Sequence, residues 1–416
     1  VGGKGGGGGG TEVREYSYSI SLAIALCEGE VQRVGRIWAD GQPLDQQSLE
    51  WRLHKGTETQ LPDPLIAAIE GADAAPAYRG TAYVVIENLQ LAPFGNRIPQ
   101  FNFEVFRRPS SSNLPAGMDP SRDIRGVALI PGTGEYSLET EPVYFRRGKG
   151  EIDVANVHND QGVADFVAST DQMVAALPNA DAVSLVVSWF GDDLRCNRCS
   201  LRPKVEQTQQ DGDNAAWRVS GIGRGSASSV SRLEGRPLFG GTPSDASVIK
   251  SIRHLNARGR SVMFYPFILM DILATNTLED PWTGSSGQPA VPWRGRITLS
   301  RAPGQSGSPD QQLAARDEVE AFAGRAARSD FEQGDWGVSY GGPEEWSFRR
   351  FILHYAHLCA AAGGVDAFCI GSELRGLTQI RDGRSSYPFV VELRRLVKDV
   401  RAILGPSVKI GYAADW

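Results

Sequence analysis

Acidic and aromatic side chains recur where four apolar segments end in the second half of the chain. Glu373 is the leading candidate, because it follows the apolar run 368–370 at the end of one such segment. Burial at a strand end can desolvate a carboxyl group and raise its pKa toward the range of a general acid. Asp415 ends the next apolar segment and is the candidate second carboxyl group. Two carboxyl groups that exchange protons across a bond are what glycoside hydrolysis requires.

The other candidates have side chains suited to binding a sugar. A rigid aromatic ring can stack on a pyranose face, while charged groups bind the hydroxyls. Two alternatives stay open: Glu373 could pair with Arg375 or cap the next segment, and the aromatic loops could simply hold the fold together. The predicted carbohydrate-binding residues are Trp189, Asp192, Asp193, Tyr265, Asp271, Trp336, Tyr340, Arg375 and Trp416.

Cysteine and histidine spacings do not predict a metal site. Cys196 and Cys199 have C-x-x-C spacing, but no second pair follows at zinc-finger distance. Ordinary thiols are favoured, with a metal shared between subunits as the alternative. His354 and His357 lie three residues apart on a predicted helix, where packing or surface exposure is expected. We therefore expect neither a metal nor a cofactor.

An alternation of strands and helices positions the candidate residues. Strands that alternate with helices predict a parallel sheet, whose carboxyl ends meet at one edge. The units fit half of an eight-fold barrel or a small doubly wound sheet. The barrel is favoured, because the first strand is followed by a long insertion, 191–243, and by no glycine-rich phosphate loop. The predicted strands are 182–190, 260–272, 365–373 and 408–416, and the predicted helices are 163–177, 244–257, 311–328, 344–362 and 388–404.

The first part of the chain has the period of β-strands. Between residues 16 and 26, large apolar side chains alternate with serine and alanine, and further strands are predicted at 31–38, 81–87 and 100–106. The chain is thus predicted to be multidomain, with an all-β module followed by an α/β domain. The predicted divisions are a glycine-rich linker (1–10), a β-rich module (11–109), a connector with extra strands (110–150) and the first half of a barrel-like domain (151–416).

The overall composition excludes several classes of function. The 416 residues carry a formal net charge of −6, so neither sequence-specific nucleic-acid binding nor an anionic membrane surface is expected. No apolar run reaches the roughly 20 residues that span a bilayer. Five cysteines, an odd number, indicate reduced thiols and assembly in a cytoplasm. Because the chain begins with Val1 and ends inside a predicted strand, we expect it to be part of a longer protein.

Several long segments carry a resemblance to a known family. Residues 78–109 resemble the hub module of tail-tip proteins. Four later segments, 189–196, 262–272, 336–358 and 368–382, resemble the adjoining TIM-barrel-like domain. Together they are similar to the baseplate hub, or "megatron", host-specificity protein of gene transfer agents and related siphophages. The segments are YRGTAYVVIENLQLAPFGNRIPQFNFEVFRRP (78–109), WFGDDLRC (189–196), VMFYPFILMDI (262–272), WGVSYGGPEEWSFRRFILHYAHL (336–358) and FCIGSELRGLTQIRD (368–382).

The resemblance implies a homotrimer at the virion tail tip, assembled in the host cytoplasm. Its partners would be the distal tail protein, neighbouring hub and baseplate proteins, and a host cell-surface glycan. The barrel is similar to glycoside hydrolases, and Glu373 matches the place of their acid/base, although Ser372 replaces the usual asparagine before it. The resemblance leaves two functions open: a structural tail-tip component for host attachment and DNA delivery, or an active glycosidase that degrades envelope or capsular polysaccharide. Independently of the resemblance, the chain could be a free glycosidase with a β-sandwich accessory module.

Overall fold

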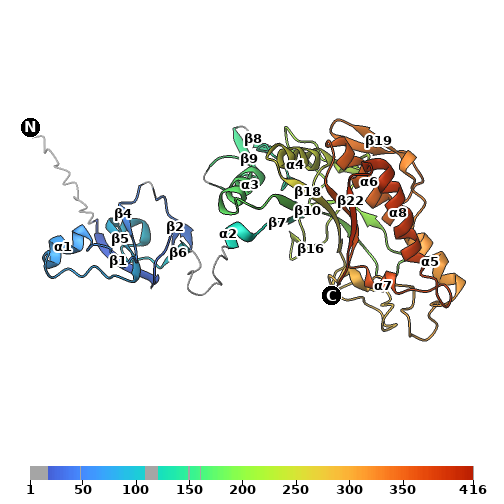
Figure 1. Ribbon diagram of the computed structural model, residues 1–416, viewed down its shortest axis with the longest axis horizontal. Helices are drawn as coiled ribbons and strands as arrows, with labels where there is room; N and C mark the ends of the chain where they lie inside the picture. The colour runs from blue at the N-terminus through green and yellow to red at the C-terminus, as the bar shows by residue number, and fades with distance from the viewer. Residues whose placement is uncertain (1–16, 47, 108–119, 149, 160, 416) are drawn as a thin grey trace, which may run out of the picture. The chain divides into compact units, whose positions relative to one another are not determined.

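The structure is a computed structural model that describes residues 17–46, 48–107, 120–148, 150–159 and 161–415. The predicted glycine-rich linker (1–10), residues 110–119 of the predicted connector and Trp416 therefore lie outside the described residues. The chain divides into two compact units, Val1–Asp119 and Pro120–Trp416 (Figure 1).

The first unit is built mainly from antiparallel strands. The alternating segment at its start forms β1, and its isoleucines and leucines pack against the core around Ile37, Val84 and Ile86, while its serines face outward. This confirms the predicted period of two. One sheet has the order β1 (Ser19–Glu28), β5 (Thr81–Gln90), β4 (Trp51–Lys55), and the other has the order β3 (Gln42–Pro43), β2 (Arg33–Ala39), β6 (Phe101–Phe106).

A short helix interrupts the expected all-β pattern. Helix α1 (Pro64–Glu70) begins with a proline at its first turn and is capped by Asp63, which accepts from the backbone N–H of Leu65 (2.9 Å) and Ile66 (3.3 Å). This "Asp-Pro" start is a recognised helix signal. The β-rich prediction therefore holds for the strands, and the helix is an addition that strand periodicity alone does not indicate.

Asp63 also ties this helix to the sheet. Its fully buried carboxylate lies 2.9 Å from Arg52 Nε and 2.8 Å from His54 Nε2, both on β4. Burial by itself raises the pKa of Asp63, but hydrogen bonds from Arg52, His54 and the helix amides outweigh it and lower the pKa to about 2.

The second unit is centred on a parallel sheet. Its strand order is β7 (Gly126–Gly132), β10 (Ala182–Gly191), β18 (Ser261–Met270), β21 (Ala367–Ser372), β22 (Lys409–Ala413), and all neighbours run parallel. The four predicted strands and their common direction are confirmed. Strand β7 is an addition, since it pairs with β10 from Gly126↔Ala182 onward. The residues after Pro120 therefore belong to this unit, which corrects the prediction of a connector reaching residue 150.

Helices cover one face of this sheet. Helix α6 contacts both α4 and α8, and Figure 1 shows α6 and α8 lying side by side along the sheet. Ser244 caps α4 as its sequence predicts, by accepting from Ser247 N at 3.1 Å. The helices are α2 (Pro120–Asp123), α3 (Asp165–Ala176), α4 (Asp245–Ala257), α5 (Leu313–Ala323), α6 (Phe348–Ala361), α7 (Arg375–Thr378) and α8 (Pro388–Leu404).

Short strands and 3-10 turns make up the long connections. The insertion after β10 holds most of them, and one strand in it, β11 (Leu201–Arg202), pairs antiparallel with β10. The others are β8 (Tyr144–Gly148), β9 (Glu151–Val154), β12 (Lys204–Val205), β13 (Arg218–Val219), β14 (Ile222–Gly223), β15 (Ser228–Ser229), β16 (Arg232–Leu233), β17 (Arg236–Pro237), β19 (Phe331–Gly334) and β20 (Gly337–Tyr340), with turns η1 (Ala92–Phe94), η2 (Arg224–Ser226), η3 (Arg294–Arg296) and η4 (Arg328–Asp330).

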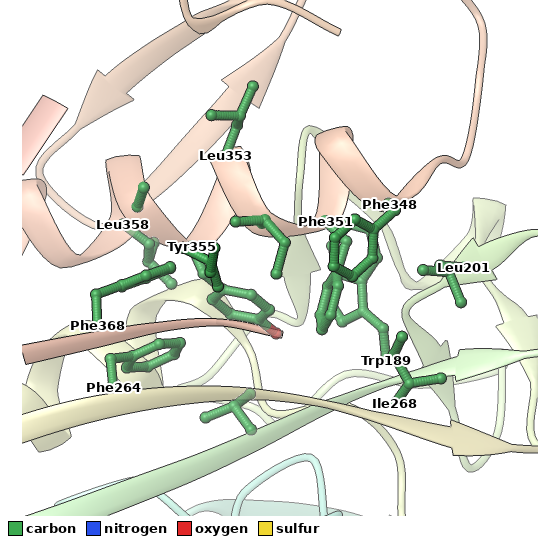
Figure 2. Close-up of a cluster of buried hydrophobic side chains, with 14 of the residues drawn as sticks. Trp189, Leu201, Phe264, Ile268, Phe348, Phe351, Leu353, Tyr355, Leu358 and Phe368 are labelled. Carbon is green, nitrogen blue, oxygen red and sulfur yellow. The ribbon is translucent and has the colours of Figure 1, made fainter. Parts of the chain in front are cut away.

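An aromatic layer joins the sheet to α6. Trp189 of β10 is 0% exposed, and its ring centroid lies 5.1 Å from that of Phe351. Figure 2 shows Phe264 and Phe368 of the neighbouring strands beneath Tyr355. The prediction that Trp189 binds carbohydrate is therefore wrong. The alternation along β10 directs Trp189 toward the helices, where the surrounding rings cover it completely.

Among the described residues, no helix combines the length and apolar character needed to cross a bilayer.

The buried network of Asp63 gives a test in the first unit. Because its pKa is lowered when folded, the stabilisation is present above the ordinary value near 3.8 and is lost as the pH falls through about 2. We expect Asp63→Asn to lower the free energy of unfolding of this unit by about 2 kcal/mol at neutral pH. Hydrogen exchange of the β4 and β5 amides measures the change, and Asp73→Asn, at an exposed position, is the control. Equal protection of these amides in both variants at neutral pH would contradict a stabilising role of the Asp63 carboxylate.

Candidate functional site

Glu373 lies directly after β21, in an unusual backbone conformation. Its φ is +52°, a left-handed region that costs free energy for a residue with a side chain. The backbone N–H of Glu373 donates to Ala413 O at 2.8 Å, so pairing with the end of β22 holds this conformation. Strained backbone of this kind clusters at functional sites, and here it turns the Glu373 side chain away from the regular course of the strand.

Arg294 is the charged partner of Glu373. Its Nη2 lies 2.9 Å from Glu373 Oε2, and its Nε donates to Ser372 O at 3.0 Å. The guanidinium lies 3.7 Å from the centre of the Phe267 ring, and the Arg294 side chain is only 7% exposed. Burial lowers the pKa of Arg294 and Glu373 works against that shift. Desolvation strengthens the attraction between the two groups, so Arg294 holds Glu373 in place.

Trp293 supplies the second contact of the same carboxylate. Its indole Nε1 donates to Glu373 Oε2 at 2.7 Å, yet the residue is 41% exposed. A Cβ added at Gly295 would come within 2.4 Å of the Trp293 ring, so a residue without a side chain is required beneath it. The result is an aromatic surface, open to solvent, next to a carboxylate.

Hydroxyl groups complete this strand-end site. Tyr265 Oη lies 2.6 Å from Ser372 Oγ, which also accepts from Arg294 Nη2 at 2.8 Å. On β22, the Tyr412 hydroxyl accepts from Leu374 N at 2.7 Å, and burial raises the pKa of Tyr412. These contacts join the middle of β18 to the carboxyl ends of β21 and β22. Predicted residues Glu373 and Tyr265 therefore lie in one connected network.

Asp415 and Arg375 form a second, looser ion pair. Arg375 Nη1 lies 3.7 Å from Asp415 Oδ2, and the two side chains are 56% and 22% exposed. The alternative pairing of Glu373 with Arg375 is therefore not the one that the structure shows. Each predicted catalytic carboxylate instead has its own arginine.

The predicted aspartates after β10 and β18 hold loops in place. Asp193 is buried and bound through both oxygens by Arg195, at 2.7 and 3.0 Å. Asp271, whose side chain is fully buried, accepts from Lys204 Nζ at 2.7 Å. Asp192 is exposed and accepts from Ser200 N at 2.7 Å. Buried and paired as they are, Asp193 and Asp271 do not offer a free carboxylate to a ligand, which corrects their assignment.

The aromatic residues of the β19–β20 hairpin lie against the helices. Tyr340 packs on Phe331, and burial raises its pKa to about 12. Trp336 is 55% exposed and lies 5.1 Å from the guanidinium carbon of Arg253, on α4. Trp336 is thus placed over the helical face, apart from the strand-end network. Trp416 lies outside the described residues.

The C-x-x-C cysteines and the two histidines of α6 are buried packing groups. Burial raises the pKa of Cys196 and Cys199 above the ordinary thiol value, which favours neutral thiols. His354 is fully buried and lies 3.0 Å from Asp245 Oδ1, while His357 stacks on Phe331. Helix packing is confirmed for both histidines, and surface exposure is not. Within the described residues, no group of three or more potential metal ligands comes together.

Trp293, Arg294 and Tyr412 are the site residues that sequence reasoning missed. Trp293 ends the Gly/Pro-rich aromatic segment 282–293, and Arg294 follows it. The available signal was the Trp-Arg-Gly triplet 293–295, in which an arginine that pairs a carboxylate adjoins a ring.

Part of the chain matches a known protein family and a chain of a known virion. The model of the "GTA TIM-barrel-like domain" family matches residues 346–416. A chain in the virion of a native gene transfer agent particle is 63% identical, over 28% of this chain and 27% of that one, with a TM-score of 0.24. The match thus spans about a quarter of the virion chain. No curated protein matches.

Two glycoside hydrolases are also similar. A GH113 β-1,4-mannanase is 12% identical over 57% of this chain and 45% of its own, with a TM-score of 0.25. The GH113 β-mannanase of Alicyclobacillus acidocaldarius, in complex with ManMIm, is 14% identical over 67% of this chain and 51% of its own, with a TM-score of 0.31. The family match and the 63% identity confirm the resemblance read from the sequence: residues 346–416 match the GTA TIM-barrel-like domain, and part of the chain is similar to a chain of a gene transfer agent virion.

Proposed function

We propose that the chain is a structural part of the tail tip of a gene transfer agent or related phage, where it takes part in attachment to the host surface and in DNA delivery. The supporting observation is its 63% identity with a chain of a gene transfer agent virion. In this role it is located at the baseplate, is assembled in the host cytoplasm, and forms a homotrimeric hub in contact with the distal tail protein and neighbouring baseplate proteins.

Within this role, the strand-end site binds a host glycan. The exposed Trp293 ring provides a surface for a sugar face, and Glu373 beside it provides an acceptor for hydroxyl groups. Because Glu373 Oε2 is already bound by Arg294 and Trp293, the carboxylate is oriented before any ligand arrives. Such preorganisation favours recognition.

Hydrolysis is the second candidate, favoured by the position of Glu373 at a strand end and by its left-handed backbone. Two features of the ion pairs argue against it. A general acid must be able to reach the leaving group, whereas Glu373 Oε2 is held by Arg294 and by the Trp293 indole. Asp415, the candidate second group, is paired with Arg375.

Glycan binding is tested by removing the exposed ring. We expect Trp293→Ala to weaken binding to purified host surface polysaccharide about tenfold, because stacking is lost. Biolayer interferometry on immobilised polysaccharide measures the affinity. Trp336→Ala removes another exposed tryptophan and is the matched control, with no expected change. Equal loss in both variants would refute the assignment to this site.

Hydrolysis is tested with the same polysaccharide by measuring the release of reducing ends. We expect no release by the native chain and none by Glu373→Gln. Release by the native chain that disappears in Glu373→Gln would establish the glycosidase instead.

Trimer formation is tested at the loop before β6. Ile98 is 54% exposed in an apolar Pro/Gly-rich loop, and we expect it to lie in the subunit interface. Ile98→Asp should shift the mass of the full-length protein from trimer to monomer in mass photometry. Ile69→Asp, at an exposed position on α1, is the control. A native protein that is monomeric at all concentrations would contradict the proposal.

A further inference from the structure

A second pocket lies beside β7, at the other side of the parallel sheet from the strand-end site. In the strand order, β10 and β18 separate β7 from β21. The pocket has a volume of about 1220 Å³ and is bounded by the end of β7, the β8–β9 hairpin, the start of α3 and residues 206–210. This exceeds the roughly 300–1,000 Å³ of sites for single small molecules, so the pocket can accept several linked units of a polymer.

The pocket has a rigid polar floor. Glu135 and Arg224 form an ion pair with both side chains 3% exposed. Arg224 also binds Asp211 Oδ1 at 2.6 Å and the Tyr136 hydroxyl at 2.9 Å, and Glu135 Oε1 accepts from the N–H of Glu206 at 2.5 Å. A buried ion pair with its hydrogen bonds satisfied orders the surrounding loops. The strand-end site uses none of these groups.

Aromatic rings and amides line the space above this floor. The Tyr136 and Phe145 rings meet edge to face, with centroids 5.7 Å apart, while Phe166 behind them is 4% exposed and belongs to the core. Gln209 and Gln210, both exposed, provide carboxamides at the rim. Rings combined with uncharged donors and acceptors are the chemistry that recognises sugars.

The charge of the lining selects among sugars. Four carboxylates line the pocket, of which Glu135 is paired with Arg224 and Asp165 with His158, at 2.7 Å. Arg146, the other cationic group of the lining, is paired with Asp213 at 3.2 Å, so carboxylates still outnumber cationic groups. An anionic sugar would be repelled by this excess, whereas a neutral or amino-bearing sugar would not. The carboxylates are Glu135, Asp153, Asp165 and Glu206.

We propose that this pocket is a second saccharide-binding site, which takes neutral or amino-bearing oligosaccharide chains and rejects uronic-acid chains. It is independent of Glu373 and of any hydrolysis there. Two separate sites on one domain would bind a long surface polysaccharide more firmly than either alone.

The test uses a chain whose strand-end site has been disabled. The Trp293→Ala variant is applied to a glycan array that holds neutral, amino-bearing and uronic-acid oligosaccharides. We expect binding to neutral or amino-bearing chains and at least about tenfold weaker binding to uronic-acid chains. Absence of binding to the first two classes, or a preference for the third, would overturn the proposal. If Trp293→Ala changes nothing while the pocket binds, only the strand-end site is refuted.

Variants of the pocket locate the binding. In the same background, Phe145→Ala and the double variant Gln209→Ala/Gln210→Ala should each weaken binding about tenfold. The matched control is Tyr144→Ala, the neighbouring β8 position, which is 41% exposed and outside the pocket lining. The double variant changes only exposed side chains, so it tests the site even if Phe145→Ala fails to fold. Unchanged affinity in the double variant together with loss in Tyr144→Ala would place the ligand elsewhere and overturn the assignment.

Discussion

The second unit depends on the parallel pairing of β10 with β18. Ten consecutive residue pairs, from Ala182↔Ser261 to Gly191↔Met270, join these strands without a register shift. Because side chains alternate along each strand, this register directs Trp189 and Phe264 to the same face, where α6 covers them (Figure 2). Burial of such large rings contributes about 2–3 kcal/mol each. A slip by one residue would exchange the two faces of a strand and lose this layer.

The same register creates the strand-end site on the other face. Tyr265 and Phe267, which alternate with the buried Phe264 and Ile268, are only half-buried and meet Arg294 and Ser372. Parallel neighbours bring their carboxyl ends to one edge, so residues from β18, β21 and β22 come together although they are far apart in the chain. The helices stabilise one face, and the polar network occupies the ends of the strands and the opposite face.

Charge pairing decides which chemistry this network supports. A carboxyl group in apolar surroundings keeps its proton to a higher pH, whereas hydrogen bonds from charged donors fix a carboxyl group in place. Arg294 and the Trp293 indole both contact Glu373 Oε2 and orient it in this way. This favours an oriented acceptor for binding over a proton donor for hydrolysis. Asp193 and Asp271 also follow strands, but their carboxylates form ion pairs with Arg195 and Lys204 in the loops.

The local elements could be predicted from the pattern of residues along the chain. Periodicity and capping located β10, β18, β21, β22 and the helices between them, because hydrophobic alternation and N-cap chemistry act over a few residues. The same pattern also placed Glu373 at a strand end. Three features depend on long-range contacts and could not be predicted in this way: Trp189 lies in the core, β7 joins the sheet, and Arg294 binds Glu373 across 79 positions of the chain. Periodicity predicts which face of a strand or helix is buried. It does not predict which side chains will meet there, because these come from segments that are far apart in the chain.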